Sequence, residues 1–236
     1  MTEVVLTETF AAAKSRLDAA LSAAGRDPQA AELLAVSKTK PAAMVREAHG
    51  LGQRQFGENY LQEALDKQAE LADLDDIIWH FIGPLQSNKT RQVAEHFDWV
   101  HSVDREKIAR RLAEQRPAGR PPLNVCLQVN ISDEASKAGV ALEALEPLAE
   151  TVLSLPGLRL RGLMAIPAPS GGLAEQRVPF ARLHEALEAL KARFPEAELD
   201  TLSMGMSGDL EAAVAEGATL LRLGTALFGA RPRPAA

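Results

Sequence analysis

The sequence predicts an α/β protein that folds as a single (β/α)8 barrel, the TIM-barrel architecture, with one extra helix at the N-terminus. Short apolar runs rich in β-branched and aromatic residues alternate with longer Ala-, Leu- and Glu-rich segments of helical period. This alternation favours parallel strands with right-handed crossovers, and eight strand-like runs favour a closed barrel. The length of 236 residues suits one such domain over residues 1–236. A doubly wound open sheet is the structural alternative.

The expected elements follow one another along the whole chain. The first helix covers residues 4–24, and Gly25 ends it. The eight strands are expected at 33–37, 55–58, 77–82, 99–103, 124–130, 160–166, 201–204 and 220–224. Helical segments are expected between the strands, for example at 41–50, 59–72, 104–115, 142–155, 173–193 and 208–216. Pro41 suits a first helical position because its missing N–H has no partner there, and Asp104 and Ser207 suit N-caps.

Composition disfavours several classes of function. The 26 basic and 32 acidic residues give a net charge of −6, which disfavours nucleic acids and anionic membranes as partners. No uncharged apolar run approaches the roughly 18–20 residues of a membrane span. Residues 1–5 lack the basic start and apolar core of a signal peptide, and Cys126 fits a buried, reduced thiol. The five histidines have no metal-ligand spacing. We therefore expect a cytoplasmic protein without a metal.

Lys38 is the first candidate functional residue. Active sites of parallel barrels lie at the C-terminal ends of the strands, and Lys38 follows the first strand on the same face as Val36. Partial desolvation there would lower the pKa of the lysine, and a neutral amine can form a Schiff base with a carbonyl. Lys40 shares the parity but is expected nearer solvent. The alternative is that both lysines are solvated loop residues.

The loops after the last two strands are the second candidate feature. Residues 203–209 run from the seventh strand into a helix, and Gly224 and Thr225 follow the eighth strand. Glycines allow backbone N–H groups to approach an anion, and barrels often bind phosphate with these loops. Asp209 would repel a phosphate unless its carboxylate points away. Simple turn geometry is the alternative explanation for the glycines.

Arg222 is a charged residue inside an apolar strand run. Such a charge is costly unless it is paired or directed at a ligand, so a structural ion pair is the alternative. A Schiff-base lysine, a phosphate loop and an inward arginine together suit a ligand that carries both an aldehyde and a phosphate. Pyridoxal 5′-phosphate (PLP) is such a molecule.

At this point the sequence resembles the family of pyridoxal phosphate homeostasis proteins, whose fold is that of the alanine racemase N-terminal barrel. The stretches that carry the resemblance span nearly the whole chain in the order of the family: residues 35–41, 56–60, 79–89, 162–164, 203–207 and 222–229. The resemblance implies that PLP is bound covalently to Lys38 as a Schiff base. It implies further cofactor contacts from Asn59, Met164, Ser203, Met206, Ser207, Arg222, Gly224 and Thr225.

The roles implied for these residues divide by the part of the cofactor that they contact. Asn59 and Met164 would line the ring, and Arg222 would face the pyridine nitrogen. Ser207, Gly224 and Thr225 would hold the phosphate, with Ser203 nearby and Met206 in the same loop. A guanidinium beside the ring nitrogen disfavours its protonation and mutes carbanion chemistry.

The resemblance implies a protein without turnover that stores, buffers or delivers PLP, with PLP-dependent apoenzymes as possible acceptors. We expect a monomer, because we expect no racemase-type partner domain. A PLP-dependent amino-acid racemase is the alternative, but racemization needs an acid or base on each face of the substrate carbon. The barrel racemases supply a tyrosine from a second domain, which we expect to be absent. The single tyrosine, Tyr60, is expected in core or rim packing, and Lys137 in a solvated loop. A Schiff-base aldolase would leave Arg222 unexplained.

Overall fold

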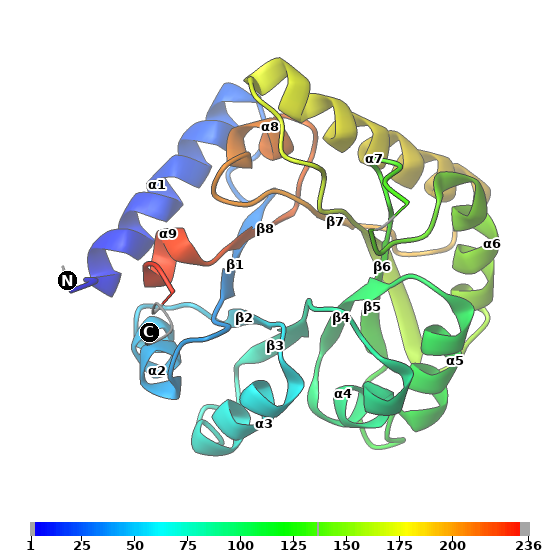
Figure 1. The fold of residues 1–236 in the computed structure, drawn as a ribbon, viewed down its shortest axis with the longest axis horizontal. Helices are drawn as coiled ribbons and strands as arrows, with labels where there is room; N and C mark the ends of the chain where they lie inside the picture. Colours follow the sequence, from blue (N-terminus) through cyan, green and yellow to red (C-terminus); the bar gives the residue numbers. More distant parts are fainter. Residues whose placement is uncertain (1–2, 136, 232–236) are drawn as a thin grey trace.

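The computed structural model describes residues 3–135 and 137–231, which form a closed barrel of parallel strands surrounded by helices (Figure 1). The fold class predicted from the sequence is therefore confirmed, and the open sheet is excluded because β1 pairs with both β2 and β8. The strands are β1 (Glu32–Val36), β2 (Gln55–Glu58), β3 (Ile78–Phe81), β4 (Trp99–Val103), β5 (Leu123–Gln128), β6 (Leu158–Met164), β7 (Thr201–Ser203) and β8 (Leu220–Leu223).

The helices lie on the outside of the barrel. They are α1 (Leu6–Ala23), α2 (Ala42–Gly50), α3 (Leu61–Glu70), α4 (Thr90–His96), α5 (Glu106–Gln115), α6 (Leu142–Leu153), α7 (Leu173–Arg193), α8 (Leu210–Ala215) and α9 (Thr225–Phe228), with a 3-10 turn at Ser87–Lys89. The predicted N-terminal helix is α1, which packs against α8 and α9 (Figure 1). No helix within residues 3–135 and 137–231 is both long and apolar enough to span a lipid bilayer.

The sequence-based predictions are least accurate at the first residues of the helices. Helix α8 begins at Leu210 with Asp209 at its N-cap, so Ser207 is not the cap. The Asp209 carboxylate instead accepts a hydrogen bond from the Met206 N–H at 2.7 Å. Arg105, not Asp104, is the N-cap residue of α5, and the Asp104 carboxylate accepts a hydrogen bond from the Gly139 N–H at 3.1 Å. Helices α4 and α9 follow β3 and β8 and are not among the segments given as examples.

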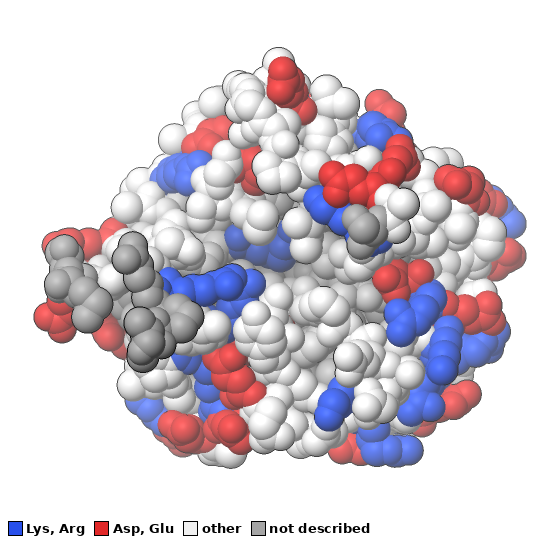
Figure 2. All heavy atoms as spheres, in the orientation of Figure 1, with Lys and Arg blue, Asp and Glu red and all other residues white. Residues whose placement is uncertain are grey.

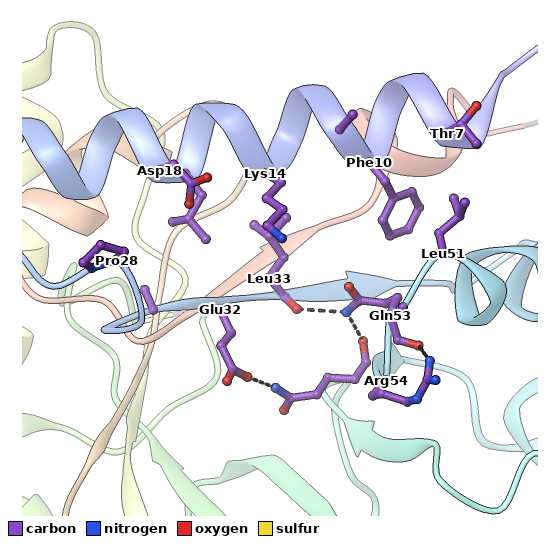
Figure 3. A pocket seen from close by; sticks show the side chains of 15 residues that line it. Thr7, Phe10, Lys14, Asp18, Pro28, Glu32, Leu33, Leu51, Gln53 and Arg54 are labelled. Atoms are coloured by element: carbon purple, nitrogen blue, oxygen red, sulfur yellow. Dashed lines mark hydrogen bonds between the residues drawn. The ribbon is translucent and has the colours of Figure 1, made fainter.

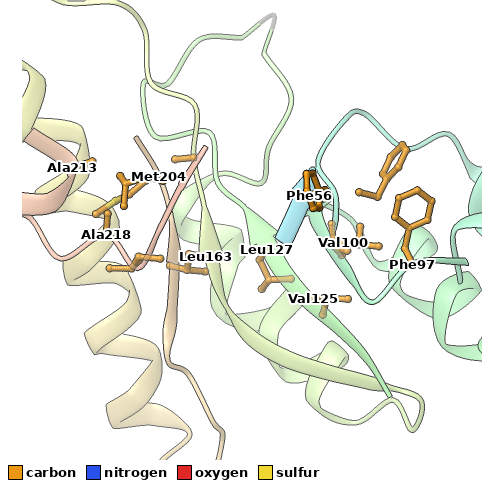
Figure 4. Packing of buried hydrophobic residues seen from close by; sticks show 14 of the residues in the cluster. Phe56, Phe97, Val100, Val125, Leu127, Leu163, Met204, Ala213 and Ala218 are labelled. Atoms are coloured by element: carbon orange, nitrogen blue, oxygen red, sulfur yellow. The ribbon is translucent and has the colours of Figure 1, made fainter. Parts of the chain in front are cut away.

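The main hydrophobic core lies between the strands and the helices. Alternate strand residues such as Phe56, Val100, Val125 and Leu163 face outward and pack against helix residues (Figure 4). Each large apolar side chain buried here contributes roughly 1.5–3 kcal/mol. This outer core closes the barrel and leaves the opposite face of each strand for the interior.

The barrel interior holds two small apolar clusters that are separate from the main core. Leu34, Val36 and Ile82 form one, and Trp99, Cys126 and Met164 form the other. Neither contains a helix residue, because the strands separate them from the helices. Cys126 is fully buried as predicted, and burial raises the pKa of its thiol to about 12. Buried polar residues, among them His80, His101 and Arg222, also lie in the barrel interior, whereas branched apolar residues dominate most barrel interiors.

Candidate functional site

Lys38 lies in the loop directly after β1, on the side of the strand that faces the barrel interior. Its neighbour of the same parity, Val36, belongs to an interior cluster. Lys38 is half-buried, and this burial, together with the charge of Arg231, lowers the pKa of its amine below the usual value. Among the described residues, its Nζ has no hydrogen-bond or ion-pair partner. Lys38, Gly224 and Thr225 line one small cavity of about 40 Å³.

Lys40 is distinguished from Lys38 by its contacts. Its Nζ donates a hydrogen bond to the Ala230 carbonyl oxygen at 2.8 Å. Lys40 therefore ties the loop after β1 to the C-terminal segment, whereas no residue within 3–135 and 137–231 bonds the amine of Lys38.

The backbone on both sides of Lys38 is held by charged side chains of α3. Thr39 has a φ of 66°, a left-handed conformation that is uncommon for a β-branched residue. Its N–H donates to Glu63 Oε1 at 2.5 Å. Lys67 Nζ donates to the Ser37 carbonyl oxygen at 2.7 Å. These two bonds hold the loop in the conformation that presents Lys38.

A buried ionic cluster, made of Glu58, Glu63 and Lys67, supports this loop. Lys67 Nζ lies 2.6 Å from Glu58 Oε1 and 2.8 Å from Glu63 Oε1. Glu58 is fully buried, and its burial raises the pKa of the carboxyl to about 7 against the opposing effect of Lys67. The sequence analysis missed this cluster. The Glu63 and Lys67 spacing of four residues on a helix, together with a glutamate that ends a short strand, was the available signal.

The loop after β7 has the predicted backbone character. Gly205 has a φ of 97°, and a Cβ there would lie 2.5 Å from Ala213 Cβ, so only glycine fits. The Asp209 carboxylate is occupied by the Met206 N–H. Among the described residues, the backbone N–H groups of Ser207 and Gly208 have no acceptor. The same holds for the N–H groups of Gly224 and Thr225 after β8. Two neighbouring loops thus offer free donors to an anion.

Arg222 is buried in the barrel interior, with 5% of its surface exposed. Its Nη1 donates to Ser203 Oγ at 2.7 Å and its Nη2 to the Ala165 carbonyl oxygen at 2.9 Å. Within the described part of the chain no carboxylate pairs with it, so the structural ion pair considered from the sequence is not observed. Burial lowers the pKa of the guanidinium to about 10, which leaves it charged at neutral pH.

The other candidate residues are not all brought into one cavity. Met164 and Ser203 are fully buried near Arg222. Asn59 carries a buried Oδ1 without a hydrogen-bond partner, and it lines a neighbouring cavity of about 310 Å³ together with Tyr60. Met206 is 42% exposed and lines a third cavity, of about 240 Å³.

The molecular surface at the C-terminal ends of the strands is consistent with an anion site. Figure 2 shows a hollow near the barrel centre, with Lys and Arg side chains bordering it over β1 and β8. Tyr60 is half exposed on the rim, and Lys137 is exposed and pairs with Glu134 at 3.1 Å, as expected from the sequence. A larger cavity, of about 560 Å³, lies under α1 at the opposite ends of β1 and β2 (Figure 3). It contains none of the predicted site residues.

Comparison with known proteins identifies a family to which the sequence is similar. The family model described as the alanine racemase N-terminal domain matches residues 11–232. A Pseudomonas aeruginosa protein called pyridoxal phosphate homeostasis protein is 67% identical over 226 residues, which is 96% of each chain. A protein of the same description from Escherichia coli strain K12 is 54% identical over 228 residues, covering 96% of this chain and 97% of its own.

A solved structure agrees with the sequence relatives. PipY of Synechococcus elongatus, solved with PLP bound, superposes with a TM-score of 0.79 at 45% identity, covering 90% of this chain and 100% of PipY. The chain, which these relatives match over 90–96% of its length, therefore belongs to the family of pyridoxal phosphate homeostasis proteins within the alanine racemase N-terminal fold.

Proposed function

We propose that this chain binds pyridoxal 5′-phosphate at Lys38 and holds it without turnover, in the storage, buffering or delivery of the cofactor. The observation that carries the proposal is the free, half-buried amine of Lys38 with its lowered pKa, in one cavity with the loop after β8. The PLP-bound structure of PipY supports the same ligand. PLP supplies an aldehyde that condenses with amines and an aromatic ring that withdraws electrons.

The donors at the mouth of the barrel fit each part of this molecule. Lys38 Nζ would attack the aldehyde carbon, with loss of water, to give a Schiff base. The free N–H groups of Ser207, Gly224 and Thr225 suit the phosphate, with Met206 in the same loop. Asn59, with its unpartnered Oδ1, and Met164 would line the ring. Arg222 would donate to the pyridine nitrogen, and Ser203 would act through Arg222 because its hydroxyl accepts the guanidinium bond.

Two features of proton transfer at the site support the proposed absence of turnover. A charged Arg222 beside the ring nitrogen disfavours protonation of that nitrogen, which weakens the ring as an electron sink. Racemization also needs an acid or base opposite Lys38. Tyr60 lines a different cavity from Lys38, which supports binding over racemization. We further propose a single-domain, monomeric cytoplasmic protein whose acceptors are PLP-dependent apoenzymes.

Reduction with borohydride tests the attachment point. We expect the purified protein, loaded with PLP, to be yellow and to lose this colour on reduction, with the reduced adduct on Lys38 by peptide mass spectrometry. Lys40→Ala is the matched control, since Lys40 shares the loop but is bound to Ala230, and it should retain the adduct. An adduct on another lysine, or no uptake of PLP, would contradict the proposal. Chiral chromatography after incubation with each amino-acid enantiomer tests for racemization.

A further inference from the structure

A line of hydrogen bonds leads from Arg222 down through the interior of the barrel. Arg222 donates to Ser203 Oγ, which also lies 2.7 Å from His101 Nδ1. His101 Nε2 in turn lies 2.8 Å from His80 Nδ1. Ser203 and both histidines are fully buried, and they come from β7, β4 and β3. The bonds therefore cross the interior from one side of the barrel to the other.

The line continues to the opposite end of the strands. His80 Nε2 lies 2.9 Å from Gln55 Oε1, and Gln55 Nε2 donates to Glu32 Oε2. Gln55 opens β2 and Glu32 opens β1. Glu32 is exposed and borders the cavity under α1, where Figure 3 draws its hydrogen bond. We call the six residues the interior chain: Arg222, Ser203, His101, His80, Gln55 and Glu32.

The two ends of the interior chain fix the direction of every bond in it. A guanidinium only donates hydrogen bonds and a carboxylate only accepts them. The Glu32 carboxylate therefore accepts a hydrogen bond from the side-chain amide of Gln55, and the amide oxygen of Gln55 then faces His80.

The same direction then determines the tautomers of both histidines. His80 donates from Nε2 to Gln55 and accepts at Nδ1, so His101 donates from its own Nε2. His101 Nδ1 is left to accept the hydroxyl hydrogen of Ser203, whose oxygen accepts from Arg222. Both imidazoles are thus neutral with the proton on Nε2. Burial agrees with this state, because it lowers the pKa of His80 to about 3 and that of His101 well below its usual value.

Buried polar groups are retained in proteins when each finds a partner, and hydrogen bonds in a chain polarise one another. We propose that Ser203, His101 and His80 are positioning residues for Arg222, and that Glu32, at the opposite end of the barrel, fixes the direction of their hydrogen bonds. The inference rests on the proposed function for one point only, which is that Arg222 faces the ring nitrogen of bound PLP.

The tautomers can be measured without any cofactor. In protein labelled with ¹⁵N-histidine, long-range ¹H–¹⁵N correlation spectra should give His80 and His101 in the Nε2–H form from pH 5.5 to 8. Glu32→Lys replaces the terminal acceptor with a donor, so Gln55 must turn its amide, and both histidines should shift to the Nδ1–H form. Glu47→Gln, at an exposed site on α2, is the control and should change neither. An Nδ1–H form in the unmodified protein, or unchanged tautomers in Glu32→Lys, overturns the inference.

A double-mutant cycle tests the action on Arg222. His101→Leu removes the acceptor of the Ser203 hydroxyl, and it should weaken PLP binding roughly tenfold, about the contribution of one hydrogen bond. It should also shift the absorbance of bound PLP in the same direction as Arg222→Ala does. In the Arg222→Ala background the same change should alter affinity less than about twofold. His101→Asn keeps an acceptor for Ser203 and should restore most of the affinity, which also covers a leucine variant that folds poorly.

The two possible failures are distinguishable. Equal losses of affinity in both backgrounds overturn the positioning role and leave the proposed function intact. Failure of the unmodified protein to bind PLP overturns the proposed function, while the tautomer spectra still decide whether Glu32 directs the interior chain.

Discussion

Replacing the buried Glu58 with glutamine should change how the stability of the protein depends on pH. The pKa of this carboxyl in the folded state is about 7, against an ordinary value of 4.5. The folded protein therefore holds a proton that the unfolded chain has released between these two pH values, so stability falls as pH rises through this window. At about 1.4 kcal/mol per pKa unit, this single group accounts for a loss of about 2–3 kcal/mol between pH 5 and pH 8.

Glu58→Gln removes the titration and leaves Lys67 paired with Glu63 and the Ser37 carbonyl oxygen. Urea unfolding, followed by tryptophan fluorescence at pH 5, 6, 7 and 8, gives the free energy of unfolding of both proteins. Relative to the variant, the unmodified protein should lose about 2–3 kcal/mol across this range. Glu70→Gln, at an exposed site on α3, should have no such effect.

Two results would refute the reasoning. A difference that stays constant within about 0.5 kcal/mol means that the folded-state pKa of Glu58 is not raised. A difference of the opposite sign means that the attraction of Lys67, which opposes burial, exceeds the cost of desolvating the carboxylate.

Four further changes have defined outcomes. Lys38→Ala should abolish the borohydride-stable adduct while weak, phosphate-anchored PLP binding persists; full visible absorbance would mean that another lysine is attached. Arg222→Ala should weaken binding less than Lys38→Ala and shift the spectrum of bound PLP, as measured by titration. Gly205→Ala should cost about 2–4 kcal/mol in urea unfolding, from overpacking and a positive φ, whereas Gly208→Ala, with open space at its Cβ, should be nearly neutral. Lys67→Met should cost about 1–3 kcal/mol, because Glu58 then takes up a proton and the Ser37 carbonyl oxygen loses its donor.

The barrel and the ends of its strands were predictable because their signals are local. A strand that packs on helices through its outer face shows its apolar residues within a few positions, so β2 and β4 begin and end where the sequence predicts. The position of Lys38 after β1 and of Arg222 within β8 then follows, since parallel strands of a barrel direct their C-terminal ends to one face.

The sequence by itself therefore determined the architecture and the candidate residues at the barrel mouth. Only the tertiary structure decided how those residues are supported. The bond from Ser203 to His101 joins residues 102 positions apart, and the ion pair that supports the Lys38 loop joins α3 to the end of β2. Such contacts depend on closure of the barrel, which brings together one inward-facing side chain from each of several strands. No periodicity within a single strand or helix carries that information.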